Sequence, residues 1–123
     1  MLRYFVLFLL VLFSFSSCIS EKDDQLLGKW KAIKLLEQDS SLQLPLEDIW
    51  FQFKEQKHYY FHSTLNYEEA GQYELSGNLL YTTDTTSDLT ERKAVKILEL
   101  SEKILKIEMK DQGNQRILIL EKE

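Results

Sequence analysis

The sequence predicts an all-β domain, folded as a single antiparallel barrel of eight up-and-down strands behind an N-terminal signal segment. Apolar residues recur with period two in short runs, which is the pattern of half-buried strands. Most gaps between the runs are two to four residues long, whereas parallel strands need crossovers of about a dozen residues or more. Closing an up-and-down sheet removes its two unpaired edges, so closure is the economical arrangement.

The N-terminal segment predicts export. The apolar run from Tyr4 to Phe13 has ten residues, whereas a membrane-spanning helix needs about 20. Arg3 precedes this run, and Ser14, Ser16 and Ser17 follow it. A charged start, a short apolar centre and a small-residue end are typical of a secretory signal peptide.

The only cysteine, Cys18, follows this segment. A lone cysteine cannot form a disulfide within its own chain. Phe15-Ser16-Ser17-Cys18 resembles the lipobox of a bacterial lipoprotein, with Phe15 in place of the usual leucine. The resemblance implies that residues 1–17 are a lipoprotein signal peptide and that Cys18 is the lipidated N-terminus of the mature protein, held on the membrane by its acyl chains. The alternative is an ordinary secretory signal with an incidental cysteine.

Residues 18–25 are predicted to form an acidic tether. Within it, Ser20-Glu21-Lys22-Asp23-Asp24 resembles the lysine-and-acid tag that follows the lipidated cysteine in surface-exposed lipoproteins of the Bacteroidetes. This resemblance implies lipid anchoring in the outer membrane with display on the cell surface. A solvated linker on a periplasm-facing lipoprotein is the alternative, since short charged runs are usually solvated.

Residues 26–123 are sufficient for one small domain. The whole chain of 123 residues has a formal net charge of −5, and its lysines alternate with glutamates instead of forming a basic patch. This argues against nucleic acid as a partner. The membrane, reached through the lipid, is the partner that the N-terminal segment implies.

Eight runs are predicted as strands by their alternation and their bounding turn residues. They are Gly28–Glu37, Asp48–Lys54, Lys57–Leu65, Ala70–Ser76, Asn78–Thr83, Arg92–Leu100, Lys103–Lys110 and Gln115–Glu121.

Turn residues support the order of the strands. Ser76-Gly77-Asn78 and Asp111-Gln112-Gly113-Asn114 are hairpin signals, because glycine and asparagine tolerate positive φ. Two longer gaps, 38–47 with the sole proline and 84–91, are predicted as loops. A helical turn is possible around Leu42–Leu46.

Alternation also predicts which side chains face the interior. They are Ile49, Phe51, Phe53, Tyr73, Leu75, Leu105, Ile107 and Met109. Residues 117–120 are apolar on both faces of their strand, which suggests that the outer face is covered as well. The loop around Leu42–Leu46 is the candidate cover.

Four segments together resemble the lipocalin-like domains of Bacteroidetes lipoproteins, over roughly residues 26–122. They are the opening Leu27-Gly28-Lys29-Trp30, the hairpin segment Lys57-His58-Tyr59-Tyr60, the central Gly71–Leu80 with its G-x-Y-x-L-x-G-N-x-L pattern, and Ile97–Leu105. The resemblance implies that the Trp30 ring plugs the barrel base and that a late arginine, here Arg116, packs across it. A solvated strand arginine is the alternative at Arg116. Many members of the family bind small apolar molecules.

The candidate binding residues are aromatic side chains that would line a cavity in the barrel. They are Trp30, Phe51, Phe53, Tyr59, Phe61 and Tyr73. The leading hypothesis is therefore a small apolar ligand held between these rings. Aromatic residues at strand spacing are more often simply core. The alternative function is then a non-catalytic interaction module, of docking or immunity type, with a filled interior.

The sequence suggests no catalysis, metal or cofactor. His58 and His62 are four residues apart on a predicted strand, which places them about 13 Å from each other. Zinc sites need three or four ligands, and no further cysteine is present. Glu68 and Glu69 are neighbours in an extended chain, so they point to opposite faces and are predicted to be solvated. We therefore expect a protein that is not an enzyme.

Overall fold

The computed structural model describes residues 21–86, 91–111 and 113–123. A short helix, α2 (Glu21–Leu26), precedes nine strands. The strands are β1 (Gly28–Glu37), β2 (Ser40–Ser41), β3 (Trp50–Lys54), β4 (His58–Ser63), β5 (Tyr67–Ser76), β6 (Leu79–Asp84), β7 (Glu91–Leu100), β8 (Ile104–Asp111) and β9 (Asn114–Lys122). The predicted signal peptide, residues 1–17, and Cys18 lie outside the described residues.

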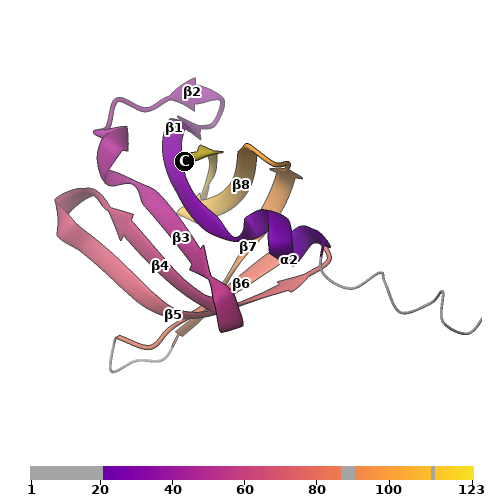
Figure 1. The fold of residues 1–123 in the computed structure, drawn as a ribbon. Helices are drawn as coiled ribbons and strands as arrows, with labels where there is room; N and C mark the ends of the chain where they lie inside the picture. The colour runs from indigo at the N-terminus through magenta and orange to yellow at the C-terminus, as the bar shows by residue number, and fades with distance from the viewer. Residues whose placement is uncertain (1–20, 87–90, 112) are drawn as a thin grey trace, which may run out of the picture.

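The strands form one antiparallel sheet that closes on itself. Consecutive strands from β3 to β9 are neighbours, and β1 pairs with both β3 and β9 (Figure 1). The prediction of a closed eight-stranded barrel is therefore confirmed. The additional two-residue strand β2 pairs only with the end of β1, and it is too short to be predicted from alternation.

Strand bounds agree with the prediction to within a few residues. β1 has the predicted bounds, but β3 begins at Trp50 instead of Asp48, because Leu46–Asp48 forms the 3-10 turn η2. This turn replaces the predicted helical turn at Leu42–Leu46. The physical reason is Pro45, because a proline disfavours helical backbone at the preceding residue and is tolerated at the start of a helical turn.

Several tight turns are formed without glycine. The turns after β1, β3 and β4 each have two successive residues with positive φ: Gln38 and Asp39, Gln56 and Lys57, and Leu65 and Asn66. In the two-residue turn after β1, this backbone matches the twist of the flanking strands. The turns after β3 and β4 have three residues each, Glu55–Lys57 and Thr64–Asn66. The turns at Gly77 and Gly113, both with positive φ, lie where the sequence predicted them.

A bulge in β1 changes which residues face the core. The register with β9 shifts between Ala32 and Lys34, so Ala32 and Leu35 are both buried and Ile33 between them is 47% exposed. One extra residue in a strand reverses the alternation beyond it. The bulge thus lets β1 continue to contribute apolar side chains along its whole length.

The helix α2 closes one end of the barrel, at the opposite end of β1 from β2 (Figure 1). Its last residue, Leu26, is fully buried in the same cluster as Trp30. Lys57 of the turn η3 (Glu55–Lys57) forms an ion pair with Asp23 of α2, with 2.7 Å between Nζ and Oδ1. Residues 21–25, predicted as part of a tether, therefore form a helix that is attached to the barrel.

The core fills the interior from this closed end, at Leu26, along β1 as far as Leu35. Its buried side chains are Leu26, Trp30, Ala32, Leu35, Ile49, Phe51, Phe53, Tyr59, Tyr73, Leu80, Leu105, Ile107, Leu118 and Leu120. Leu75 and Met109, predicted to face inward, are partly buried against this cluster. Leu42 and Leu46 also pack against the core cluster, whereas Ile117 and Ile119 are half-buried.

Within the described ranges, no helix has the length and apolar character required to cross a membrane.

Candidate functional site

The six predicted cavity-lining residues lie in the barrel interior or at its edge. Trp30, Phe51, Phe53, Tyr59 and Tyr73 are buried, and Phe61 is half-buried and packs against them. The rings contact one another. Phe51 stacks on Phe53 and Phe61 with centroid distances of 5.4 and 4.4 Å, and Phe53 meets Tyr73 edge-on at 5.0 Å. These side chains therefore fill much of the space between them.

Trp30 closes the core beneath α2. Its indole Nε1 donates a hydrogen bond of 2.7 Å to the carbonyl oxygen of Leu26. The Lys122 ammonium lies 5.1 Å from the centroid of the ring and donates to the carbonyl oxygen of Gln25 at 3.0 Å. The cation over Trp30 thus comes from the last strand, as the lipocalin resemblance implies, but it is Lys122.

Arg116, the candidate for that position, lies near the other end of β1. Its Nε is 3.3 Å from the Glu37 carboxylate, and the register pairs the two residues directly. The prediction that Arg116 packs across Trp30 is therefore wrong. The two positions in β9 are six residues apart and share the inward face, so alternation alone could not distinguish them.

A buried carboxylate lies inside the barrel. Glu69 of β5 has a side chain that is only 7% exposed. Its Oε1 accepts a hydrogen bond from the Tyr59 hydroxyl at 3.0 Å, and its Oε2 accepts one from Tyr67 at 2.6 Å. Lys93 reaches from β7 to the same Oε2 at 2.8 Å. Every polar group of this Glu69 cluster is thus paired, as burial requires.

The cluster shifts the ionisation of its members. Burial and the nearby Glu69 charge raise the pKa of Tyr59 far above its usual value. The hydrogen bond to Glu69 raises the pKa of Tyr67. At Lys93 burial opposes the ammonium charge, but the hydrogen bond and charge of Glu69 outweigh it and raise the pKa. All three shifts favour the protonated form in the folded protein.

These directions predict an alkaline loss of stability. A group whose pKa is higher in the folded than in the unfolded state stabilises the fold at pH values below its unfolded-state pKa. That contribution is lost as the pH rises above the unfolded-state pKa. For the buried Tyr59 we expect the free energy of unfolding to fall by about 1.4 kcal/mol per pH unit above about pH 10. Urea unfolding at a series of pH values measures this slope.

The Tyr59→Phe variant should have a shallower slope because it lacks the buried hydroxyl. Tyr81→Phe is the control, since it removes the same hydroxyl from a tyrosine outside the Glu69 cluster. Equal slopes for wild type and Tyr59→Phe would contradict the prediction.

Sequence reasoning missed the Glu69 cluster. Alternation does place Glu68 and Glu69 on opposite faces, and Glu68 is exposed. The prediction that both are solvated is wrong for Glu69, which shares the inward face of β5 with Tyr73. The available signal was the alternation, which places Glu69 on the inward face of β5. Glu69 pairs with Phe61 of β4, and Tyr59 lies two residues from Phe61 on the same face.

The outer face of β3, β4 and β5 has a second group of rings. Trp50 pairs with His62 in register, and their rings stack at a centroid distance of 5.6 Å with parallel planes. Tyr60 is 44% exposed and pairs with Ala70 of β5. The small side chain of Ala70 leaves space beside the Tyr60 ring.

Two clefts meet at Tyr60 and Ala70. One, here called the aromatic cleft, has a volume of about 410 Å³. It is lined by Trp50, Tyr60, Phe61, His62, Glu68, Glu69, Ala70 and Thr86. Phe61 is the predicted cavity-lining residue that this cleft includes.

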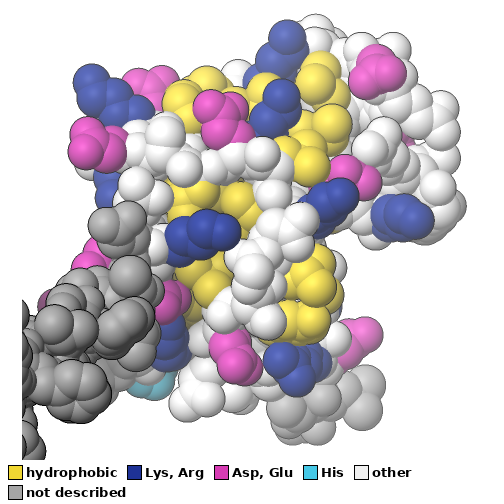
Figure 2. Space-filling view, turned by 90° about the vertical axis from the view of Figure 1, so that its right-hand side faces the viewer, with side chains coloured by type: hydrophobic (Ala, Val, Ile, Leu, Met, Phe, Trp, Pro, Cys, Tyr) yellow, Lys and Arg dark blue, Asp and Glu magenta, His cyan; other side chains and the backbone are white. Residues whose placement is uncertain are grey.

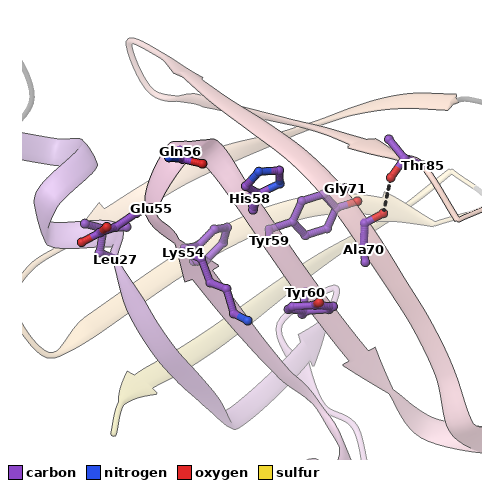
Figure 3. A pocket seen from close by; sticks show the side chains of 11 residues that line it. Leu27, Lys54, Glu55, Gln56, His58, Tyr59, Tyr60, Ala70, Gly71 and Thr85 are labelled. Atoms are coloured by element: carbon purple, nitrogen blue, oxygen red, sulfur yellow. Dashed lines mark hydrogen bonds between the residues drawn. The ribbon is translucent and has the colours of Figure 1, made fainter.

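The other, here called the larger cleft, has a volume of about 850 Å³ and extends along β3, β4 and β5. Its lining residues come from Leu27 beside α2, the turn η3, β4 and Thr85 (Figure 3). Phe53 and Tyr59 border it. Thr85 is held beside Ala70 because its backbone N–H and its hydroxyl both donate to the Ala70 carbonyl oxygen, at 2.9 and 3.3 Å.

Solved structures provide the decisive comparison. A lipocalin-like protein from Bacteroides uniformis superposes with a TM-score of 0.60 and 18% identity, covering 80% of this chain and 99% of its own. An uncharacterized protein from Bacteroides eggerthii superposes with a TM-score of 0.57 and 15% identity over the same shares. The chain has a lipocalin-like fold. Comparisons with protein-family models and with curated proteins find no match.

The surface of this lipocalin-like barrel mixes both signs of charge. On the face drawn in Figure 2, basic and acidic side chains are interspersed, with hydrophobic groups between them. Opposite charges also pair directly, as in the ion pair between Lys31 and Glu123, 2.6 Å apart. Opposite charges that alternate in this way produce no extended field of one sign on this face.

The two histidines lie on the outside of the lipocalin-like barrel. His58 is exposed, whereas His62 stacks on Trp50 and its Nδ1 lies 2.5 Å from the Asp48 carbonyl oxygen. In the part of the chain that the structure describes, no group of three or more histidine, cysteine or acidic side chains could hold a metal ion.

Proposed function

We propose that this protein is a non-enzymatic, lipid-anchored lipoprotein of the cell envelope that binds a small apolar molecule at the aromatic cleft. The lipocalin-like fold supports a role in small-molecule binding, although a fold alone does not specify a ligand. The residues of this chain give the proposal more specific support, because the rings of Trp50, Tyr60 and Phe61 line one cleft.

The observation that carries the proposal is the size and lining of this cleft. Its volume of about 410 Å³ lies within the range of about 300–1,000 Å³ that is typical of small-molecule sites. Apolar and aromatic walls with a few polar groups are also typical of such sites. The packed rings of Phe51, Phe53 and Tyr73 favour this location over the interior between them.

Fluorescence can test binding because the chain has two tryptophans in different surroundings. Trp30 is fully buried, whereas Trp50 lines the aromatic cleft. We expect a neutral apolar probe such as phenylnaphthylamine to bind and to quench Trp50. The Ala70→Gln variant should weaken binding at least about tenfold, because the longer side chain fills the floor of the cleft.

The matched control is Ala94→Gln, on the exposed outer face of β7. It adds the same atoms far from the cleft and should bind the probe as the wild type does. Absence of binding to the wild type, or equal binding by Ala70→Gln, would overturn the ligand-binding proposal.

The anchor is an independent part of the proposal. We place Cys18 at the membrane through covalent lipid, in the outer membrane, facing either the cell surface or the periplasm. Each acyl methylene that enters the bilayer contributes about 0.8 kcal/mol. The Cys18→Ser variant should therefore move from the membrane to the soluble fraction of the cell envelope. Unchanged membrane fractionation would count against lipidation.

One observation favours a second function, the docking of another envelope protein. Leu65, at the turn between β4 and β5, is 98% exposed and has φ of 62°. A leucine exposed in this way gains no free energy from burial, and its positive φ is a strained backbone conformation for a branched side chain. Such docking would survive the Ala70→Gln substitution, which separates the two functions.

A further inference from the structure

We propose that the aromatic cleft selects apolar molecules that have a positively charged group, such as a quaternary ammonium. This inference rests on the proposed function and defines the ligand class for the same site. Its basis is the combination of the Tyr60 ring, which has the small Ala70 beside it, with the Glu68 carboxylate in one cleft.

The charge of the lining is negative. Glu68 and Glu69 both border the aromatic cleft, and none of its described lining residues is a lysine or an arginine. The Glu69 charge is offset by Lys93, 2.8 Å away. Among the described residues Glu68 has no ion-pair partner within 4.0 Å, and it lies beside His62 at the exposed side of the cleft. A cation entering the cleft would therefore meet one uncompensated carboxylate.

The rings in this region already attract ammonium groups. Lys29 Nζ lies 4.6 Å from the Trp50 ring, and Lys54 Nζ lies 4.6 Å from the Tyr60 ring. An aromatic face has negative potential, and a cation within about 6 Å of its centroid is attracted. These lysines show that the geometry for such contacts exists on this wall of the barrel.

The two faces of Tyr60 have different neighbours. Lys54 approaches from β3, whereas the neighbour on β5 is Ala70. Ala70 is small, and Glu68 lies two residues farther along the same face of β5. A ligand lying over Ala70 would thus place its apolar part against the Tyr60 ring and its charge close to Glu68. Aromatic faces are a recurring surface for quaternary ammonium recognition, and Glu68 would add a charge of opposite sign.

The net charge acts in the same direction. The chain has a formal charge of −5, which raises the local concentration of cations and lowers that of anions. An anionic ligand of the same shape would meet both this field and the Glu68 carboxylate. A neutral ligand would gain only the apolar contacts.

The test compares two probes of nearly the same shape, phenyltrimethylammonium and tert-butylbenzene, with Trp50 fluorescence as the readout. We expect the cation to bind about tenfold more tightly in low salt, with the ratio falling in high salt. Equal affinities would overturn this inference and leave the proposed function intact. If neither probe binds, both this inference and the proposed function are overturned.

Variants assign the preference to residues. Tyr60→Phe should keep the preference for the cation, whereas Tyr60→Leu should reduce it because the ring is lost. Glu68→Gln should reduce it severalfold. Glu74→Gln removes the same charge from an exposed position on β5 outside the cleft and should leave the ratio unchanged. A preference that survives both Tyr60→Leu and Glu68→Gln would overturn the assignment to this cleft.

Discussion

Replacing Trp30 with alanine should lower the free energy of unfolding by about 4 kcal/mol, which is within the range for removing a large ring from a core. Trp30 is 0% exposed, so its ring gives up water contact completely on folding. The loss would be a large part of the stability of about 5–15 kcal/mol expected for a small domain. Urea unfolding followed by circular dichroism measures it.

The size of this effect follows from what Trp30 joins. The ring lies in one cluster with Leu26 of α2, and its Nε1–H pairs with the Leu26 carbonyl oxygen. Alanine would leave a cavity at the closed end of the barrel and an unpaired buried carbonyl. The helix α2 would lose its main attachment to the core.

Two further variants separate the contributions. Trp30→Phe keeps most of the ring but removes the indole N–H, and it should cost about 1–2 kcal/mol. Trp50→Ala, on the outer face, removes an equally large ring that is only half-buried and should cost less than half as much as Trp30→Ala. Equal losses for Trp30→Ala and Trp50→Ala would contradict the assignment of Trp30 as the plug.

The barrel was predictable because each strand repeats one signal. The inward positions Phe51, Phe53 and Ile107 alternate with polar neighbours, and short gaps allow only antiparallel neighbours. The local pattern also predicted both ends of β1, Gly28 and Glu37, as the structure has them. The bulge at Ile33 was not predicted, because an apolar residue at the bulge does not interrupt the apolar run.

The candidate site was predicted less completely. Aromatic residues were expected to face inward from β3 and β4, but alternation cannot say whether inward rings surround a space or fill it. Packing between strands far apart in the sequence decides that question. The Glu69 cluster is of the same kind, since Lys93 comes from β7, and its contact with the buried carboxylate on β5 appears only when these strands are brought together.

The outer wall shows a further limit of sequence patterns. Trp50, Tyr60 and His62 occupy polar-face positions, where an exposed aromatic residue is by itself unremarkable. Their proximity depends on the register of β3 with β4. The space beside Tyr60 depends in addition on Ala70, whose small size has meaning only once its partner is known.

Replacing Gly71 with alanine should also destabilise the barrel strongly. A Cβ built on Gly71 would lie 1.9 Å from the carbonyl oxygen of Thr83 and 3.0 Å from the backbone nitrogen of Thr85. These are backbone atoms, so no side chain can rotate away. We expect a loss of about 3 kcal/mol, toward the upper end for overpacking, measured by urea unfolding.

The position explains why the strands approach so closely. Gly71 pairs with Asp84 at the end of β6, and Thr85 continues this pairing through its N–H bond to Ala70. A glycine in a strand often marks such a close approach or a bend of the sheet. Any movement of Thr83–Thr85 away from β5 would weaken the Thr85 hydrogen bond and open the larger cleft, which Gly71, Ala70 and Thr85 border.

Gly77→Ala provides the matched control because it adds the same methyl group in a different situation. Gly77 has φ of 60° and no heavy atom within 4 Å of the added Cβ, so its cost is conformational, about 1 kcal/mol. Gly71→Ala should exceed it, and amide exchange at Thr85 should accelerate only in Gly71→Ala. A smaller loss at Gly71 than at Gly77 would mean that the end of β6 can move aside without cost, and that the close contact does not hold this part of the barrel together.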